Sequence, residues 1–357
     1  MEKSIAILII NAGSTSTKVS VYQNEVPVVN ETINHPLAEL HNNPDVWTQY
    51  DNRKAKILAL LKQKEISLEQ LDVIACRCGP TKPVPGGIYR VTPAMLSDIK
   101  SRANGSHAAG VGTQIAFDLA ESLKIPAVTM DPPLTDELAN PARYSGHPLL
   151  PRKSSFHALN QKATARKVAQ ELGKPYEQLS LIVVHMGGGI SVGAHYNGKV
   201  IDVNNALDGE GPFSPSRAGT LPTGALVELC FSGRCTREEV LGMISLKGGL
   251  MAYLGTTDIP EIERRIRSGD EKARDVLEAM AYQVAKEIGA AAAVLEGNVD
   301  AIALTGNLVK SQKIVDYIKK KTSFIAPITL YPGENEMEAL ALGALRFLRS
   351  QEQAKTY

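Results

Sequence analysis

Residues 5–22 read Ile5-Ala6-Ile7-Leu8-Ile9-Ile10-Asn11-Ala12-Gly13-Ser14-Thr15-Ser16-Thr17-Lys18-Val19-Ser20-Val21-Tyr22, an apolar run, a turn of small residues and a second run rich in β-branched residues. The pattern returns as Leu181-Ile182-Val183-Val184-His185-Met186-Gly187-Gly188-Gly189-Ile190-Ser191-Val192-Gly193-Ala194-His195. Apolar runs of this length, bounded by turn residues, are typical of buried strands and too short for helices. One strand–turn–strand unit in each half predicts a duplicated domain that closes on a phosphate-bearing ligand such as a nucleotide.

The composition is that of an ordinary globular protein. The 357 residues suggest two domains, and 43% hydrophobic with 22% charged residues allow each domain a core. A net charge of +1 gives no electrostatic reason to expect nucleic acid or a membrane as partner. No apolar run approaches the roughly 18 residues that span a bilayer, and the start, Met1-Glu2-Lys3-Ser4, enters a strand rather than a signal peptide. Four cysteines are too few for a disulfide framework, so we expect free thiols and a cytoplasmic location.

Strands and helices alternate along the rest of the chain, which predicts an α/β protein with helices packed on mixed sheets. Further strands are expected at residues 26–33, 72–77, 126–130, 301–304 and 327–331, and helices at 46–61, 109–124, 157–172, 270–296 and 337–348. Thr92-Pro93 predicts a capped helix start, and Asn197-Gly198 predicts a hairpin turn. Capping boxes are expected at residues 67–70 and 236–239. Residues 288–295 are apolar all round, which predicts a helix end buried on every side.

The first turn is predicted to hold phosphate. It superficially resembles a P-loop, but no glycine precedes Lys18, and residues 19–22 alternate like a strand instead of opening a helix. We therefore expect a hairpin in which Ser14, Ser16, Lys18 and main-chain N–H groups face a phosphate. Asn11 directly before the turn supports this reading. The alternative is an ordinary polar hairpin turn.

Two further turns are candidates for nucleotide binding. Gly187-Gly188-Gly189 follows a predicted buried strand and would let the main chain approach an anion without interference from Cβ atoms. His185 ends that strand; a lone histidine is usually a core residue, but its place beside this turn favours a function. Thr305-Gly306-Asn307 is a weaker strand-to-helix turn on which a nucleoside could pack.

Four charged residues in structured loops complete the candidates. Arg77 ends a predicted strand, and Arg217 lies in the proline-rich segment 212–220. Guanidinium groups bind carboxylates and phosphoryl groups with two parallel hydrogen bonds and stay charged. Taken alone, each arginine is better explained as a partner in a surface salt bridge. Asp131 and Glu336 begin loops and are plausible contacts for Mg²⁺.

Taken together, these motifs resemble those of the acetokinase family of carboxylate kinases, in the superfamily of acetate and sugar kinases, heat-shock proteins and actin. The resemblance runs nearly end to end and rests on residues 11–18, 104–108, 155–162, 185–189 and 203–213 with Arg217. Within the family it is closest to kinases that act on butyrate. It implies actin-like, ribonuclease H-like domains in two lobes around a nucleotide cleft. We expect lobes at residues 1–154 plus 336–357, on the carboxylate and phosphate side, and 155–335, on the nucleotide side.

The resemblance also implies roles. Asn11, Ser14, Ser16 and Lys18 would line the phosphate end, and Gly187, Gly188, Gly189, Thr305, Gly306 and Asn307 would hold ATP or ADP. Arg77 and Arg217 would hold the substrate carboxylate and the migrating phosphoryl group, and His185 would stabilise charge in the transition state. His107 and His157 would line the same cleft, with Phe156 as an apolar wall. Asp131 and Glu336 would position Mg²⁺ and the nucleophile. The family's adenosine motif usually ends in two glycines, whereas this chain has Asn307, a residue type that tolerates positive φ.

The chemistry agrees with a carboxylate substrate. A carboxylate is already ionised at neutral pH and needs no general base, so catalysis requires charge cancellation and in-line positioning. We expect reversible, Mg²⁺-dependent transfer from ATP to butyrate or a similar short or branched acid, without a phosphoenzyme. Acetate kinases have a bulky residue where this chain has Ser106, which leaves room here for a longer acyl chain. The resemblance further implies a homo-oligomer. An acetate or propionate kinase remains an alternative, as does an ATP-dependent binding protein of the same fold; a sugar kinase is less favoured, because a hydroxyl nucleophile wants an aspartate base.

Overall fold

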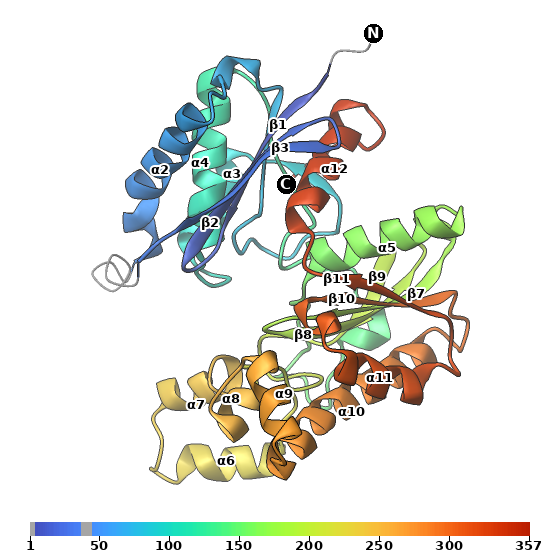
Figure 1. The fold of residues 1–357 in the computed structure, drawn as a ribbon. Coiled ribbons are helices and arrows are strands. Elements are labelled where there is room, and N and C mark those ends of the chain that lie inside the picture. The colour runs from blue at the N-terminus through green and yellow to red at the C-terminus, as the bar shows by residue number, and fades with distance from the viewer. Residues whose placement is uncertain (1–3, 37–44) are drawn as a thin grey trace. The chain divides into compact units, whose positions relative to one another are not determined.

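The computed structural model describes residues 4–36 and 45–357 and divides into two compact units (Figure 1). The first unit comprises residues 1–135 and 335–357, and the second comprises residues 136–334. The expectation for residues 1–3 lies outside the described part. Among the described residues, no helix is both long and apolar enough to cross a membrane.

The first unit is built on a six-stranded sheet in the order β3-β2-β1-β4-β6-β5. Its strands are β1 (Ala6–Ala12), β2 (Ser16–Gln23), β3 (Val26–Asn34), β4 (Val73–Cys76), β5 (Ile88–Arg90) and β6 (Ala127–Met130). Its helices are η1 (Val46–Gln49), α2 (Tyr50–Gln63), η2 (Leu68–Gln70), α3 (Pro93–Ser101), α4 (Ala108–Leu123) and α12 (Glu336–Leu348), where η marks a 3₁₀ helix. Strands β1, β4 and β6 run parallel, whereas β2, β3 and β5 each run antiparallel to a neighbour.

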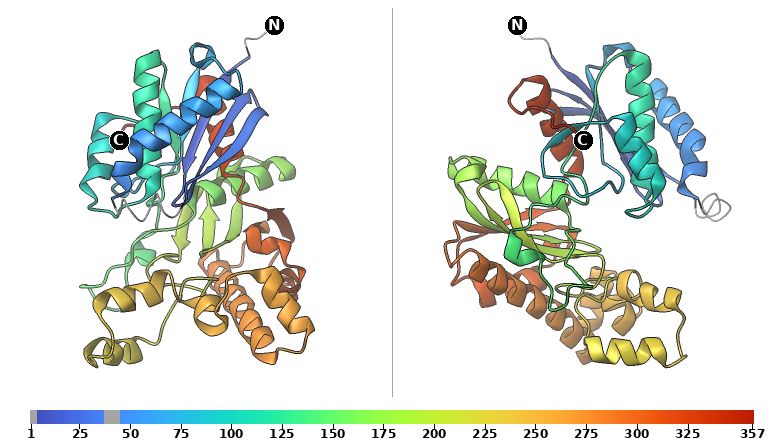
Figure 2. Two further views of the ribbon diagram at one scale, coloured as in Figure 1. Left: turned by 60° about the vertical axis from the view of Figure 1, so that its left-hand side comes forward. Right: turned by 180° about the vertical axis from the view of Figure 1, so that it is seen from behind.

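Helices cover both faces of this sheet because β1 is buried along its whole length. Leu8 and Ile10 face a core shared with α2, α3 and α4, and the alternating residues Ile7 and Ile9 point to the other face. Helix α12 contacts β1, β4 and β6, and Figures 1 and 2 show it on the side of the sheet away from α2 and α4.

The second unit has a five-stranded sheet in the order β11-β10-β7-β8-β9. Its strands are β7 (Ser180–Met186), β8 (Ile190–Tyr196), β9 (Lys199–Val203), β10 (Ala301–Gly306) and β11 (Ile328–Pro332). Its longer helices are α5 (Ala158–Leu172), α6 (Thr223–Phe231), α7 (Arg237–Ser245), α8 (Gly249–Leu254), α9 (Ile259–Arg267), α10 (Glu271–Val294) and α11 (Gln312–Thr322), and its 3₁₀ turns are η3 (Asn140–Arg143), η4 (Tyr176–Gln178) and η5 (Asn307–Lys310). Helices α10 and α11 share one core with this sheet, and α5 packs on its other face.

The duplication predicted from the two strand–turn–strand motifs is confirmed. In each sheet, the first three strands (β1 to β3, or β7 to β9) pair antiparallel with one another. On the other side of the first of them lie two strands parallel to it, β4 and β6 beside β1, and β10 and β11 beside β7. The first sheet adds only β5 beyond this shared order. The α/β class, with two repeats of one sheet topology, is therefore as expected.

Most local signals are also confirmed. Thr92 caps α3 by accepting the Met95 N–H, and Thr236 forms a capping box with Glu239. The turn Asn197-Gly198 has φ of 50° and 75°, as a two-residue hairpin with two positive φ values requires. The predicted strands and long helices lie within a few residues of their expected bounds.

Two local predictions are wrong, and one boundary differs. Ser67 makes no capping bond to the main chain, because its hydroxyl contacts the Glu69 carboxylate, and only one 3₁₀ turn follows. The end of α10 is not buried on every side: Val294 is 39% exposed, because the sheet covers only one face of the helix. Residues 136–154, expected in the first lobe, belong to the second unit, where Ala139 N–H donates to Ile201 O and Arg152 pairs with Asp202.

The four cysteines are free thiols, as expected. Cys76 at the end of β4 and Cys78 just after it are buried in the first unit, and burial raises the pKa of both thiols, that of Cys78 to about 12. Cys230 in α6 is exposed, and Cys235 is half-buried; both belong to the second unit.

Candidate active site

The candidate residues of the first unit gather at one edge of its sheet. Asn11 lies near the end of β1, Arg77 follows β4, and Asp131 follows β6. These three strands are parallel, so their carboxyl ends meet at the same edge, which is where open α/β sheets bind ligands. His107, as the N-cap of α4, and Glu336, as the first residue of α12, belong to helices packed on the same strands.

Glu336 joins two of these residues. Its Oε2 accepts a 2.7 Å hydrogen bond from Asn11 Nδ2 and lies 3.5 Å from Arg77 Nη1. Asn11 is buried and Glu336 nearly so, whereas the Arg77 side chain is 33% exposed. The structure thus brings together Asn11, Arg77 and Glu336, and a carboxylate that binds Arg77 would share that guanidinium with Glu336.

His107 and Asp131 are each fixed by main-chain hydrogen bonds. His107 Nδ1 accepts the Ala109 N–H at 3.0 Å, which leaves the proton of the neutral ring on Nε2. Burial, and after it the charges of Arg77 and Arg53, lower the pKa of His107 from 6.5 to about 4, while Glu336 opposes the shift. Asp131 is buried with φ of 42°, and its Oδ1 accepts the Gly87 N–H at 2.8 Å.

The hairpin turn has the form predicted for it. Ser14 and Lys18 are exposed and Ser16 is half-buried. Lys18 on β2 is the register partner of Asn11 on β1, which places the ammonium-bearing residue directly opposite the buried amide. The phosphate role of Ser14, Ser16 and Lys18 stays a prediction.

In the second unit, His185 is held by the buried side-chain amide of Asn160. Its Nδ1 lies 2.7 Å from Asn160 Oδ1, and Asn160 Nδ2 in turn donates to Thr305 Oγ1 and to the Glu334 carbonyl. Because both donors of the Asn160 amide are used in this way, its oxygen accepts from His185 Nδ1–H. The Nε2 atom of the neutral ring is then an acceptor, and it can donate to an anion only when the ring carries a second proton.

His157 stacks on His185. Their ring centroids are 3.8 Å apart and their planes differ by 13°. His157 Nδ1 lies 3.0 Å from Ser191 Oγ, which also accepts a 2.7 Å hydrogen bond from Gln161 Nε2. The structure therefore brings together both histidines that were predicted for this half of the chain.

The triple-glycine turn lies against Arg217. A Cβ atom on Gly189 would be 2.1 Å from Arg217 Nη1, so a side chain there would collide with the guanidinium. A Cβ on Gly187 would be 2.9 Å from His185 Nε2, whereas Gly188 has open space. Ser214 Oγ donates to the Gly188 carbonyl at 2.6 Å and ties the segment around Arg217 to this turn. Burial lowers the pKa of Arg217, and the charge of Asp208 opposes this.

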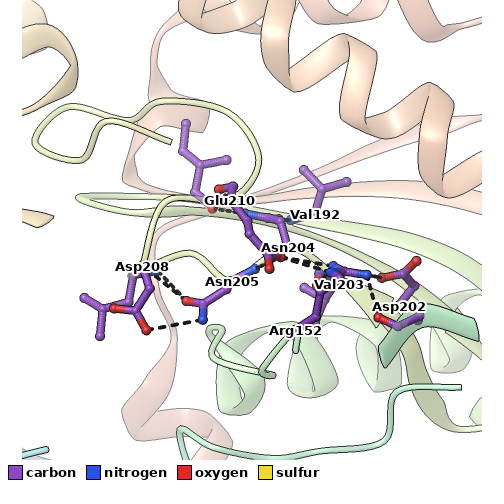
Figure 3. Close-up of polar contacts among 11 residues, drawn as sticks. Arg152, Val192, Asp202, Val203, Asn204, Asn205, Asp208 and Glu210 are labelled. Carbon is purple, nitrogen blue, oxygen red and sulfur yellow. Dashed lines mark hydrogen bonds and ion pairs between the residues drawn. The ribbon is translucent and has the colours of Figure 1, made fainter. Parts of the chain in front are cut away.

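The segment 204–210 supports Arg217, whose Nη1 donates to the Ala206 carbonyl at 2.8 Å. Figure 3 shows how this segment is anchored. Arg152 contacts Asp202 and Glu210, and Glu210 Oε2 also accepts the Asn205 N–H at 3.0 Å. Arg152 therefore indirectly fixes the Ala206 carbonyl, which accepts the hydrogen bond from Arg217.

The turn at residues 305–307 differs from the prediction in one respect. The positive φ belongs to Gly306, at 96°, and Asn307 begins η5 as an exposed residue with ordinary φ. A Cβ on Gly306 would lie 2.3 Å from the Met186 carbonyl, so only glycine fits there. The tolerance of asparagine for positive φ is therefore not needed for this turn.

Phe156 packs as a core residue, in a cluster with Leu138, Ala142, Val200 and Val203. Its predicted role as a wall of the acyl pocket stays a prediction. Among the residues that the structure describes, no group of three or more histidine, cysteine, aspartate or glutamate side chains could hold a metal ion. Mg²⁺ usually takes one or two carboxylates and completes its shell with water and substrate phosphates. Asp131 and Glu336 each offer the carboxylate oxygens that Mg²⁺ prefers, and their role as its ligands stays a prediction.

Sequence reasoning missed several polar residues that support the site. Asn160 and Gln161 are buried on the face of α5 that packs on the sheet, and Arg53 is buried on α2. The available signal was position: Arg53 lies one and two helical turns before Ile57 and Leu61, on the apolar stripe. A polar or charged residue on such a stripe must have internal hydrogen-bond partners.

Residues 132–325 match the model of the acetokinase family. A Clostridium acetobutylicum protein, Butyrate kinase 2, is 51% identical over 351 residues, which cover 98% of this chain and 99% of that protein. The chain belongs to the acetokinase family. As an acetokinase it is a carboxylate phosphotransferase, which confirms the class of enzyme predicted from the motifs, and kinases of this family use ATP and ADP.

Solved acetokinase structures share the fold. Porphyromonas gingivalis acetate kinase superposes with a TM-score of 0.78 at 18% identity, over 97% of this chain and 100% of that one. A propionate kinase from Francisella tularensis gives 0.71 at 17% identity, over 95% and 98%. At these identities the likeness concerns the fold alone, and it confirms the actin-like class.

Proposed function

We propose that this acetokinase transfers the γ-phosphoryl group of ATP to butyrate or a short or branched fatty acid of similar size. A carboxylate oxygen attacks phosphorus, the bond from phosphorus to the β–γ bridging oxygen breaks, and acyl phosphate and ADP form. The reaction is direct and in-line, without a phosphoenzyme. It is reversible, because an acyl phosphate is at least as activated as ATP.

The observation that best supports butyrate is the 51% identity to Butyrate kinase 2 over nearly the whole chain. The charges of the candidate site support the chemistry. A carboxylate substrate needs no base, but the meeting of two anions must be offset by positive charge and hydrogen-bond donors. Arg77, Arg217 and Lys18 provide the charge, and His185 adds to it when its ring is protonated.

In the first unit, we assign Asn11, Ser14, Ser16 and Lys18 to the phosphate end of the ligand. Arg77 binds the substrate carboxylate, and neutral His107 offers its Nε2–H to an oxygen. Asp131 and Glu336 would hold Mg²⁺, which would supply positive charge against the phosphates of the nucleotide.

In the second unit, the turns at residues 187–189 and 305–307 bind the nucleotide, and Arg217 binds the migrating phosphoryl group. His185 stabilises developing charge through Nε2. Since Asn160 holds the other ring proton, this role requires the doubly protonated ring. His157, stacked on His185 at 3.8 Å, keeps that ring in place.

We assign the selection of acids by size to Ser106, an exposed residue directly before His107. A small side chain at this position leaves room for additional methylene groups, each worth about 0.8 kcal/mol when buried. One or two methylenes discriminate only about 10- to 200-fold in an apolar pocket, so we expect activity on several acids.

A hydroxamate assay tests this function. The protein is incubated with ATP, Mg²⁺, hydroxylamine and one acid of a series from acetate to valerate, isobutyrate included. A rate that peaks at four carbons supports a butyrate kinase. A peak at acetate or propionate would favour the shorter-chain alternative, and no trapped product with any acid would exclude the proposed reaction.

The proposal also includes a homo-oligomeric assembly and a cytoplasmic location. Helix α6 and its neighbours expose Phe231, Leu246 and Val227, at 87%, 70% and 48%, which favours contact with another protein surface. Light scattering after gel filtration tests the assembly; a single-chain mass of 38.4 kDa would contradict it.

A further inference from the structure

Arg53 is a buried cation close to the phosphate-binding hairpin. It lies on α2, and only 1% of its surface is exposed. Ile57 and Leu61 follow it on the same face of the helix and are fully buried in the core of the first unit. A charged group at such a position is costly to bury unless all its hydrogen bonds are made.

All five N–H groups of Arg53 have acceptors. Nε donates to Gln49 Oε1 at 2.9 Å, and Nη1 donates to Thr17 Oγ1 at 2.7 Å and Ser16 O at 3.2 Å. Nη2 donates to Gly13 O at 3.0 Å and Ser14 O at 3.1 Å. An arginine has five donors in a fixed planar fork, so this set is complete.

Four of these five bonds go to the β1–β2 hairpin: two to residues 13 and 14 of the turn, and two to Ser16 and Thr17 at the start of β2. The fork holds the carbonyl oxygens of residues 13, 14 and 16 on the side that faces α2, together with the hydroxyl of Thr17. Two residues of the hairpin are exposed: Ser14 in the turn, and Lys18, which follows Thr17 on β2. Carbonyl oxygens would repel a phosphate, and Arg53 binds three of those at the hairpin.

The charge of Arg53 is not cancelled by these partners, because each of the five acceptors is a neutral oxygen. Its field reaches His107 in the same unit: burial lowers the pKa of this histidine most, and the charges of Arg77 and Arg53 lower it further. The hydrogen bonds of Arg53 and its charge therefore both favour an anion at the hairpin.

We propose that Arg53 is a positioning residue that shapes the hairpin turn for the phosphates of the nucleotide and adds a positive charge that its five hydrogen-bond acceptors do not neutralise. The inference rests on the proposed function, because it assumes that this turn meets phosphate. It concerns a residue that touches the turn and not the substrate.

The test is Arg53→Lys, which keeps the charge but loses the planar fork. We expect MgATP to bind about tenfold more weakly by isothermal titration calorimetry, because the turn loses its shape. Adenosine, which has no phosphate, should bind within twofold of the wild-type affinity. In the hydroxamate assay, KM for ATP should rise more than KM for the acid.

Leu61→Ala is the matched control. Leu61 lies on the same face of α2, two helical turns beyond Arg53, and is 1% exposed, so its truncation destabilises the first unit while the fork of Arg53 keeps its five acceptors. It should lower the thermal midpoint while leaving MgATP affinity unchanged. If Leu61→Ala weakens MgATP binding as Arg53→Lys does, the effect is general destabilisation and the proposal is wrong.

Thr17→Val provides a second variant if Arg53→Lys does not fold. It removes one acceptor of the fork, together with the 2.9 Å contact of Thr17 Oγ1 to His35 Nε2, and leaves the charge. We expect a smaller weakening of MgATP binding, again with adenosine binding unchanged. Unchanged MgATP affinity in folded Arg53→Lys or Thr17→Val would overturn the inference. A wild-type protein that binds MgATP but phosphorylates no acid would refute only the proposed function, because the binding comparison can still be made.

Discussion

Replacement of Gly189 by alanine tests whether the triple-glycine turn exists to admit Arg217. The new Cβ atom would lie 2.1 Å from Arg217 Nη1, 2.8 Å from Cζ and 3.2 Å from His157 Cε1. Real Cβ contacts are essentially never shorter than 3.0 Å, so the guanidinium has to retreat by about 1 Å, from 2.1 Å to at least 3.0 Å. That movement strains or breaks its 2.8 Å bond to the Ala206 carbonyl.

The expected loss of activity follows from this displacement. A misplacement of about 1 Å can cost roughly 10²-fold in rate, and loss of a charge-assisted hydrogen bond costs about 1.5–3 kcal/mol, or about 10- to 150-fold. We therefore expect Gly189→Ala to lower kcat by between 10- and 100-fold in the hydroxamate assay. The thermal midpoint should change little, because Arg217 can move away from the core.

Two comparisons make the result decisive. Gly289→Ala, on the exposed side of α10 where a Cβ meets nothing within 4 Å, should leave kcat unchanged. In an Arg217→Ala background, Gly189→Ala should cost little more, because the group it displaces is already gone. The reasoning fails if Gly189→Ala keeps the wild-type kcat, or if the two losses multiply.

Three further outcomes are expected. Asn160→Ala should lower kcat about tenfold with little change in KM for ATP, because His185 Nδ1–H loses its acceptor. Asn160→Asp keeps an acceptor and should retain more activity. Equal kcat in the wild type and both variants would contradict this prediction. His107 has a pKa of about 4 in the folded protein against 6.5 in the unfolded chain. As the pH drops from 6.5 toward 4, the unfolded chain binds the proton first, so the free energy of unfolding should fall. Urea unfolding at pH 7.5 and 5.5 should show a smaller loss of this free energy in His107→Gln than in the wild type. Lys162→Met should lower the free energy of unfolding by about 3–5 kcal/mol, because it leaves the buried Glu137 carboxylate, whose two oxygens lie 2.8 Å from Lys162 Nζ, without its cation. Adding Glu137→Leu should recover much of this loss. A Lys162→Met protein as stable as the wild type would refute the prediction.

Local signals predicted the parts of this molecule that local physics determines. The hairpins at residues 5–22 and 181–195 follow from alternating apolar runs and turn residues, and both formed as expected. The cap at Thr92 depends on two neighbouring residues, and it formed too. The Ser67 box failed because the serine hydroxyl had a competing acceptor two residues away.

The support of the site depends on contacts between distant segments, and the sequence alone does not specify them. His157 and His185 were both candidates, but their stacking requires the start of α5 to lie over the end of β7. Arg53 reaches a turn almost forty residues earlier, and no local pattern shows which carbonyls it binds. What the sequence did offer was a charged residue on an apolar helical stripe, a conflict that internal hydrogen bonds had to resolve.

The distribution of thiols gives the chain a built-in reporter for each unit. Thiol reagents attack the thiolate, so Cys76 and Cys78, buried and with raised pKa, should be modified only when the first unit opens. Cys230 in the second unit reacts without any opening and gives the reference rate. The ratio of the two labelling rates, read by mass spectrometry in the native protein, measures the local opening of one half alone. A ligand that tightens the sheet carrying the hairpin would slow the first rate and leave the second unchanged.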